Sequence, residues 1–222
     1  MTLRKLIAYF LLITCVMSII SPGAFAAQSD PKFFISENFD GRATGSSPDF
    51  VAKTGKNVYI KEVISGEDKA LFMKTLKKSA GVTVGFESSS SEFVLSFDMG
   101  IDKNIPEGYV AVKSSSSSVK ALIVESTPNR ASLTTYDYKE VGGIVPGKNV
   151  HIDMAFNMAS KKYSVYVNGS IAVSDWFIKG TVPTSIQSVE FNFNGTSSEI
   201  PAEIYLNNLY AYSGNSVLDK AK

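Results

Sequence analysis

Cysteine is almost absent from this sequence. Its one cysteine, Cys15, lies within the first 26 of 222 residues. A chain without a second cysteine forms no internal disulfide, so the fold must rest on its hydrophobic core. Histidine and tryptophan are equally rare, with His151 and Trp176 as the single examples. Any chemistry that needs an imidazole must therefore use His151.

Neither sign of charge is in excess. The chain holds 22 Lys and Arg against 21 Asp and Glu. Removal of the first 26 residues with Arg4 and Lys5 lowers the basic count from 22 to 20, for a formal charge of −1. Without a basic surplus there is no electrostatic reason to bind nucleic acid or an anionic membrane. We expect neither as a partner.

The first 26 residues have the composition of a secretory signal peptide. Arg4 and Lys5 supply the positive start, residues 6–20 the apolar run, and the small-x-small pattern ends at Ala26. We expect cleavage between Ala26 and Ala27 and a secreted protein at the cell surface. Export without cysteine is more typical of a bacterial surface than of a disulfide-rich animal one.

Two alternatives remain for this segment. An uncleaved membrane anchor needs roughly 20 apolar residues, which is more than the run offers. Lipidation of Cys15 usually requires a small residue just before the cysteine, and Leu12-Ile13-Thr14 lacks one.

Long amphipathic helical patterns are missing as well. From Phe33 onward, short segments alternate apolar and polar residues, which is the period of a strand with one buried face. Residues 70–76 also suit a helix, but the Ser and Gly residues on both sides favour a strand. We expect one domain over residues 27–213 and a loose tail over 214–222. The expected strands outside the hairpin described next are 33–39, 57–64, 70–76, 81–86, 93–101, 109–112, 119–124, 131–136, 186–193 and 204–212.

The clearest pattern is a hairpin over residues 150–173. Apolar residues alternate through 150–156 and resume from Tyr163, and Asn168-Gly169 predicts a tight turn before Ile171. If Phe156 faces Tyr163, both lie on the buried face together with Met154 and Val165. The same parity places His151, Asp153 and Tyr166 on the other face.

The order of these segments resembles a known family. It is carried by Glu37-Asn38-Phe39-Asp40-Gly41 followed by Gly45 and Pro48, the hairpin 162–169, and the closing strand 204–209. The chain is similar to the concanavalin A-like (laminin G-like) domains of secreted bacterial proteins. The resemblance implies an all-β, two-sheet antiparallel jelly-roll sandwich. The family contains lectin-like modules, glycosidases, lyases and structural domains, so the resemblance implies the fold more strongly than the function.

An enzyme on this fold would need a recognisable set of groups. Glycosidases of the family place carboxylates at alternate positions of one strand, and no Glu-x-Asp-x-x-Glu run occurs here. The family's lyases use a His and a Tyr, for which His151, Asp153 and Tyr166 are the candidates. Polar residues at every second position also describe a solvated outer face. No Gly-x-Ser-x-Gly nucleophile turn is present.

A sugar-binding module needs exposed aromatic side chains, because the apolar C–H faces of sugar rings stack on them. Tyr136 and Tyr138 are expected on one strand face, Tyr166 points outward, and Trp176 follows Asp175 near a turn. The alternative is that these residues pack at the core or its rim. The candidate ligand-binding set is His151, Asp153, Tyr166, Tyr136, Tyr138 and Trp176.

No cofactor is expected, and calcium remains an open alternative. Glu37, Asp40 and Asp49 offer hard oxygen ligands around a Gly/Ser loop, in a spacing that matches no ligand pattern. Related closing strands often carry Asp where this chain has Asn207, and this difference weakens the expectation of an inherited calcium site.

The prediction is a secreted, non-catalytic module that binds a polysaccharide or glycan. The alternatives are a polysaccharide lyase or glycosidase, and a structural module of the cell envelope that docks a protein.

Overall fold

The computed structural model describes residues 31–47, 57–62, 68–86, 92–197 and 199–214, and the backbone of 51–54. The expected signal peptide with its Ala26–Ala27 bond, Asp49 and residues 215–222 of the tail lie outside the described residues. The chain divides into two compact units, Met1–Pro31 and Lys32–Lys222. All elements named below belong to the second unit.

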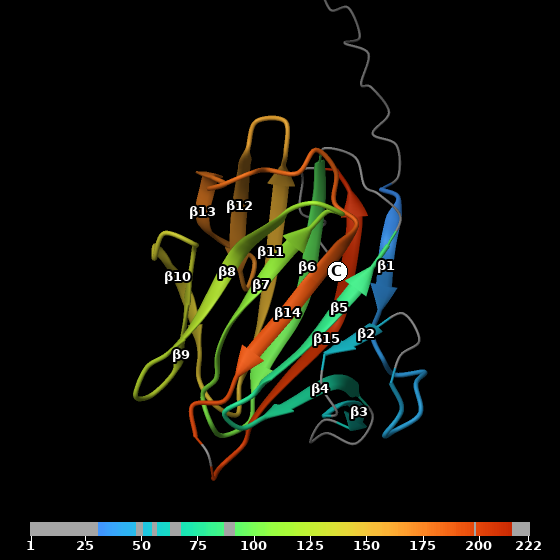
Figure 1. Ribbon diagram of the computed structural model, residues 1–222, viewed down its shortest axis with the longest axis vertical. Coiled ribbons are helices and arrows are strands. Elements are labelled where there is room, and N and C mark those ends of the chain that lie inside the picture. The colour runs from blue at the N-terminus through green and yellow to red at the C-terminus, as the bar shows by residue number, and fades with distance from the viewer. Residues whose placement is uncertain are drawn as a thin grey trace, which may run out of the picture. The chain divides into compact units, whose positions relative to one another are not determined.

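The described residues form two antiparallel sheets (Figure 1). The eight-stranded sheet runs in the order β13 (Ser170–Phe177), β12 (Lys162–Val167), β11 (Asn149–Asn157), β6 (Glu92–Ile101), β15 (Ala202–Ser213), β4 (Lys69–Thr75) and β3 (Val58–Glu62), with β1 (Phe33–Glu37) also paired to β15. The seven-stranded sheet runs in the order β10 (Glu140–Ile144), β9 (Ala131–Thr134), β8 (Ser118–Ser126), β7 (Glu107–Lys113), β14 (Ser188–Asn194), β5 (Ser79–Gly85) and β2 (Val51–Thr54). Within this part of the chain, no helix has the length and apolar character that a membrane span requires.

Alternate side chains of both sheets meet in one hydrophobic core. Phe97 of β6 meets Phe191 of β14 edge-on across the sheets, with ring centroids 5.1 Å apart. Phe93 stacks on Phe156 at 4.7 Å, and Phe156 stacks on Tyr163 at 5.6 Å. The expected two-sheet jelly-roll sandwich is confirmed, because each strand's period of two leaves one face for this core.

The β11–β12 hairpin has the expected register. Phe156 lies opposite Tyr163, and Asp153 lies opposite Tyr166. Asn168 and Gly169 both have positive φ, 50° and 75°, the backbone conformation that tight two-residue hairpins require. His151 and Asp153 therefore lie on the outer face of the eight-stranded sheet, as predicted.

Other expectations need correction or addition. The strand expected at 70–76 is confirmed as β4, with the bounds Lys69–Thr75. However, β9 ends at Thr134, so Tyr136 and Tyr138 lie in the β9–β10 turn and do not share a strand face. Trp176 lies within β13, one residue before that strand ends at Phe177. The alternation also missed β2 and β10, and the Gly142-Gly143 pair of β10 is poor strand material.

Candidate functional site

The candidate residues separate into two groups. His151, Asp153 and Tyr166 lie together on the outer face of the eight-stranded sheet. Tyr136 and Tyr138 lie in the β9–β10 turn of the other sheet. The Trp176 side chain joins this second group, because it donates a hydrogen bond to Asp137 of that turn. The two groups therefore lie on separate surfaces.

In the first group, His151 lies between two carboxylates. Its Nδ1 is 2.7 Å from Asp98 Oδ1, and its Nε2 is 3.1 Å from Asp153 Oδ2. The pairing of β11 with β6 creates this arrangement, because it sets His151 opposite Asp98 and Asp153 opposite Ser96. Asp98 was not among the sequence candidates, since nothing local reveals that β6 and β11 are neighbours.

These contacts keep the imidazole charged. Hydrogen bonds, first with Asp153 and then with Asp98, raise the pKa of His151 to about 10 against its ordinary 6.5. At neutral pH both ring nitrogens therefore carry a proton and donate. An imidazolium has no lone pair with which to take a proton, so His151 is poorly suited to act as a general base.

A third strand joins the cluster through Asn208. Its Nδ2 donates to Asp98 Oδ2 at 2.7 Å, and its φ of 48° marks a bulge of β15. Asp153 is only 4% exposed. The charged groups of this cluster thus bind one another. Tyr166, the third predicted residue of this face, is half-buried and makes no polar contact with the cluster among the described residues.

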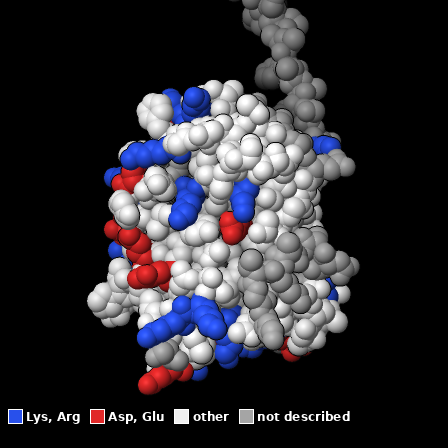
Figure 2. Space-filling view, viewed as in Figure 1, with Lys and Arg blue, Asp and Glu red and all other residues white. Residues whose placement is uncertain are grey.

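Tyr136 and Tyr138 of the second group line a groove of about 880 Å³ along β7, β8 and the β9–β10 turn. Tyr138 is 72% exposed and Tyr136 is 50% exposed. Figure 2 shows the molecule from the side of the seven-stranded sheet, where basic and acidic side chains are interspersed. We call this site the tyrosine groove, and its lining residues are Glu107, Gly108, Tyr109, Lys120, Ile123, Val124, Glu125, Ser126, Thr127, Tyr136, Asp137, Tyr138 and Lys179.

Tyr109 and Lys120 were missed by the sequence reasoning and lie on the sheet wall of the groove. The Lys120 ammonium is 4.3 Å from the centroid of the Tyr109 ring. Burial, and then the charge of Glu190, raise the pKa of Tyr109, so its hydroxyl stays protonated and can donate. Lys120 forms no ion pair with another described residue, and its ammonium is therefore available to a ligand.

Asp137 holds the β9–β10 turn in place. Its Oδ1 accepts hydrogen bonds from the Thr135 hydroxyl and from Trp176 Nε1, both at 2.7 Å. These bonds, with the Lys179 ammonium 3.6 Å from Oδ2, lower the pKa of Asp137. Trp176 is half-buried and packs against the core, so it positions the turn that carries Tyr136 and Tyr138.

Two of the oxygen ligands considered for calcium, Glu37 and Asp40, already have protein partners. Glu37 accepts the backbone N–H of Phe39 and binds Arg42 at 2.6 Å. Asp40 accepts from Asn38 Nδ2 and from the backbone N–H of Lys69. Across the described ranges, no group of three or more His, Cys, Asp or Glu side chains is arranged to hold a metal ion.

No protein-family model matches the chain, and no curated protein matches it. Solved structures do resemble it. A sialidase matches with a TM-score of 0.57 at 18% identity, over 82% of this chain and 19% of that one. An alginate lyase of polysaccharide lyase family 7 matches with a TM-score of 0.52 at 13% identity, over 83% and 94% of the two chains.

A third likeness is to botulinum neurotoxin type C, whose cell entry depends on interaction with two ganglioside molecules; its TM-score is 0.54 at 12% identity, over 83% of this chain and 48% of that one. This chain thus spans less than half of the sialidase and neurotoxin chains. At these identities the likeness concerns the fold, and it defines the class as a two-sheet jelly-roll β-sandwich. Assignment to the concanavalin A-like family remains a prediction.

Proposed function

We propose that this protein is a non-catalytic module that binds a polysaccharide or glycan in the tyrosine groove. The observation that carries the proposal is the pair of exposed rings, Tyr136 and Tyr138, on a turn that Trp176 and Asp137 fix beside a hollow of about 880 Å³. A hollow of this size lies within the range of small-ligand sites.

The chemistry of the groove suits a sugar. Tyrosine rings stack on the C–H faces of sugars and add hydroxyl groups that donate and accept hydrogen bonds. Tyr109, Lys120 and Glu125 supply further donors and acceptors along the wall. The protein need not rearrange for this contact, because Asp137 already holds the turn, and a pre-organised site loses less entropy on binding.

A lyase or glycosidase is less well supported. The single histidine is a clamped imidazolium on the other sheet, outside the tyrosine groove. A screen for reducing sugar or unsaturated uronate should detect no release by the wild type. Sugar release that His151→Ala abolishes would contradict the non-catalytic proposal.

The test of the proposal is a glycan array followed by calorimetry on the glycan that the wild type retains. Tyr138→Ala should weaken binding by about two- to tenfold, the loss of one stacking contact. The matched control is Tyr166→Ala, which removes a tyrosine from the outer face of the other sheet and should leave affinity unchanged. If Tyr166→Ala weakens binding and Tyr138→Ala does not, the glycan binds on the surface that holds His151. If no glycan on the array binds and a protein co-purifies, a structural module is favoured.

A further inference from the structure

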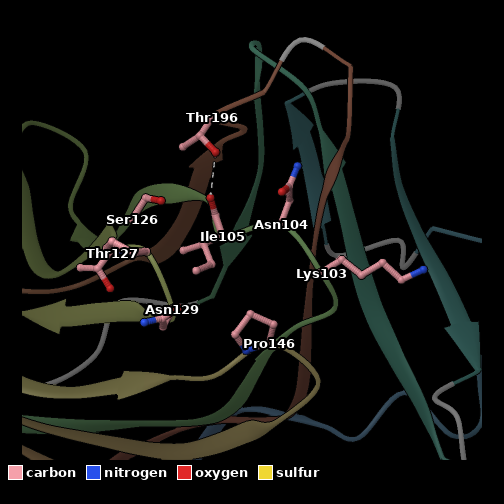
Figure 3. A pocket seen from close by; sticks show the side chains of 9 residues that line it. Lys103, Asn104, Ile105, Ser126, Thr127, Asn129, Pro146 and Thr196 are labelled. Carbon is pink, nitrogen blue, oxygen red and sulfur yellow. Dashed lines mark hydrogen bonds between the residues drawn. The ribbon is translucent and has the colours of Figure 1, made fainter.

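A second hollow, of about 600 Å³, lies at one end of the sandwich (Figure 3). Four connections line it: β6–β7 with Asn104 and Ile105, β8–β9 with Thr127 and Asn129, β10–β11 with Pro146, and β14–β15 with Thr196. We call it the end pocket.

The end pocket adjoins the tyrosine groove. Ser126 and Thr127, at the end of β8, line both hollows. A ligand that lies along β8 in the groove therefore reaches the lining of the end pocket at this strand end.

Hydrogen bonds between described residues hold the walls of the pocket. Thr196 donates its hydroxyl to the Ile105 carbonyl at 3.1 Å, the contact drawn in Figure 3. Thr127 donates its hydroxyl to the Arg130 carbonyl at 2.5 Å, and Asn104 Nδ2 donates to the Ile200 carbonyl at 2.6 Å. The β6–β7 and β14–β15 connections are thus tied to each other, and the β8–β9 connection is closed by a hydrogen bond of its own.

Other polar groups of the pocket remain available. The Ser126 hydroxyl and the Asn129 amide make no hydrogen bond to another described side chain or carbonyl, and Asn104 Oδ1 accepts none. The described residues that line the pocket include no carboxylate and a single cation, Lys103, which extends its ammonium away from Thr127 and Asn129 in Figure 3. Uncharged donors and acceptors beside the apolar rings of Pro128 and Pro146 fit a sugar unit without a charge.

The charges of the groove agree with this. Three carboxylates, Glu107, Glu125 and Asp137, line it against two ammonium groups, Lys120 and Lys179. Asp137 and Lys179 pair with each other, so Glu107 and Glu125 stand against Lys120, and this excess of one negative charge disfavours an anionic ligand relative to a neutral one. This preference differs from what the names of a sialidase or an alginate lyase imply for those enzymes.

We propose that the tyrosine groove and the end pocket form one cleft that binds a neutral oligosaccharide along its length. The proposal rests on the proposed function and adds two properties to it: affinity grows with chain length until both hollows are filled, and acidic glycans are disfavoured. Ser126 marks the junction between the two parts.

The experiment compares neutral and acidic oligosaccharides of increasing length by calorimetry. The probes are cello-, xylo-, manno- and laminari-oligosaccharides from disaccharide to octasaccharide, with oligogalacturonates and alginate oligosaccharides as acidic counterparts. Ser126→Tyr blocks the junction, Ser126→Ala removes only the hydroxyl, and Ser118→Tyr places the same ring at the opposite end of β8 as the matched control. Thermal unfolding checks that each variant is folded.

We expect a neutral series to bind more tightly as it lengthens. Ser126→Tyr should remove this gain, weakening the longest member by about tenfold, the equivalent of one or two hydrogen bonds, while short members and Ser118→Tyr stay unchanged. If affinity is independent of length, or if Ser126→Tyr has no effect, the continuous cleft is wrong and glycan binding in the groove survives. Preference for the acidic series would overturn the neutral class alone. If the wild type binds none of the probes, the neutral-cleft proposal fails, and the glycan array decides the proposed function separately.

Discussion

His151 shows how a conspicuous residue acquires a role from its neighbours. Taken alone, a single histidine beside Asp153 invites a catalytic interpretation. In the structure Asp98 and Asp153 occupy both ring nitrogens, and Asn208 secures Asp98 in turn. The cluster therefore links β6, β11 and β15 through charge-assisted hydrogen bonds, which are stronger than neutral ones.

The raised pKa of His151 predicts a pH dependence of stability. A group whose pKa is higher in the folded state stabilises the fold fully below its unfolded value, 6.5, and loses that contribution as pH rises through about 10. The free energy of unfolding of the wild type should therefore exceed that of His151→Gln at pH 6, and the difference should shrink towards pH 10. Urea titrations at both pH values measure it. If the difference in unfolding free energy is the same at both pH values, Asp98 and Asp153 do not raise the pKa of His151 in the folded state.

Val165 and Tyr166 are adjacent residues on opposite faces of β12. Val165 is fully buried, so Val165→Asp places an unpaired carboxylate in the core and should cost about 3–5 kcal/mol. Tyr166 is only half-buried on the outer face, so Tyr166→Asp should cost far less. Thermal unfolding of the two variants compares them, and equal destabilisation would contradict the facing of this strand.

At the scale of elements, the contact of β7 with β14 depends on a glycine. A Cβ on Gly108 would lie 2.2 Å from the Asn192 carbonyl oxygen, which is backbone and cannot turn aside. Gly108→Ala should therefore destabilise the fold by about 1–3 kcal/mol through overpacking. Gly85 of β5 is the matched control, because a Cβ there meets nothing within 4 Å. Urea unfolding should leave Gly85→Ala close to the wild type, and similar losses in both variants would refute the role of close packing.

Elements were predictable where one strand's own alternation is strong. The β11–β12 hairpin is an example, since its turn residues and apolar parity specify the register locally. Tyr136 and Tyr138 show the limit. Their alternation with Asp137 and Lys139 imitates a strand, but the Thr135 hydroxyl accepts the backbone N–H of Lys139 and donates to Asp137, and this closes a turn.

At the scale of the whole molecule, we propose that the protein is exported and loses residues 1–26. The basis is the sequence pattern that ends at Ala26. Mass spectrometry of the protein recovered outside the cell should give an N-terminus at Ala27. A mature form that retains residues 6–20 would contradict cleavage and favour the anchor or lipoprotein alternatives.

The sequence by itself determined the all-β class, the absence of disulfides and the faces of the central hairpin, because alternation and turn chemistry act between residues close in the chain. The tertiary structure decided what those faces meet. Asp98 is 53 residues from His151, and Trp176 is 39 residues from Asp137, yet both pairs are in hydrogen-bond contact. Such contacts depend on which strands become neighbours across two sheets, and strand order follows from packing the whole core at once.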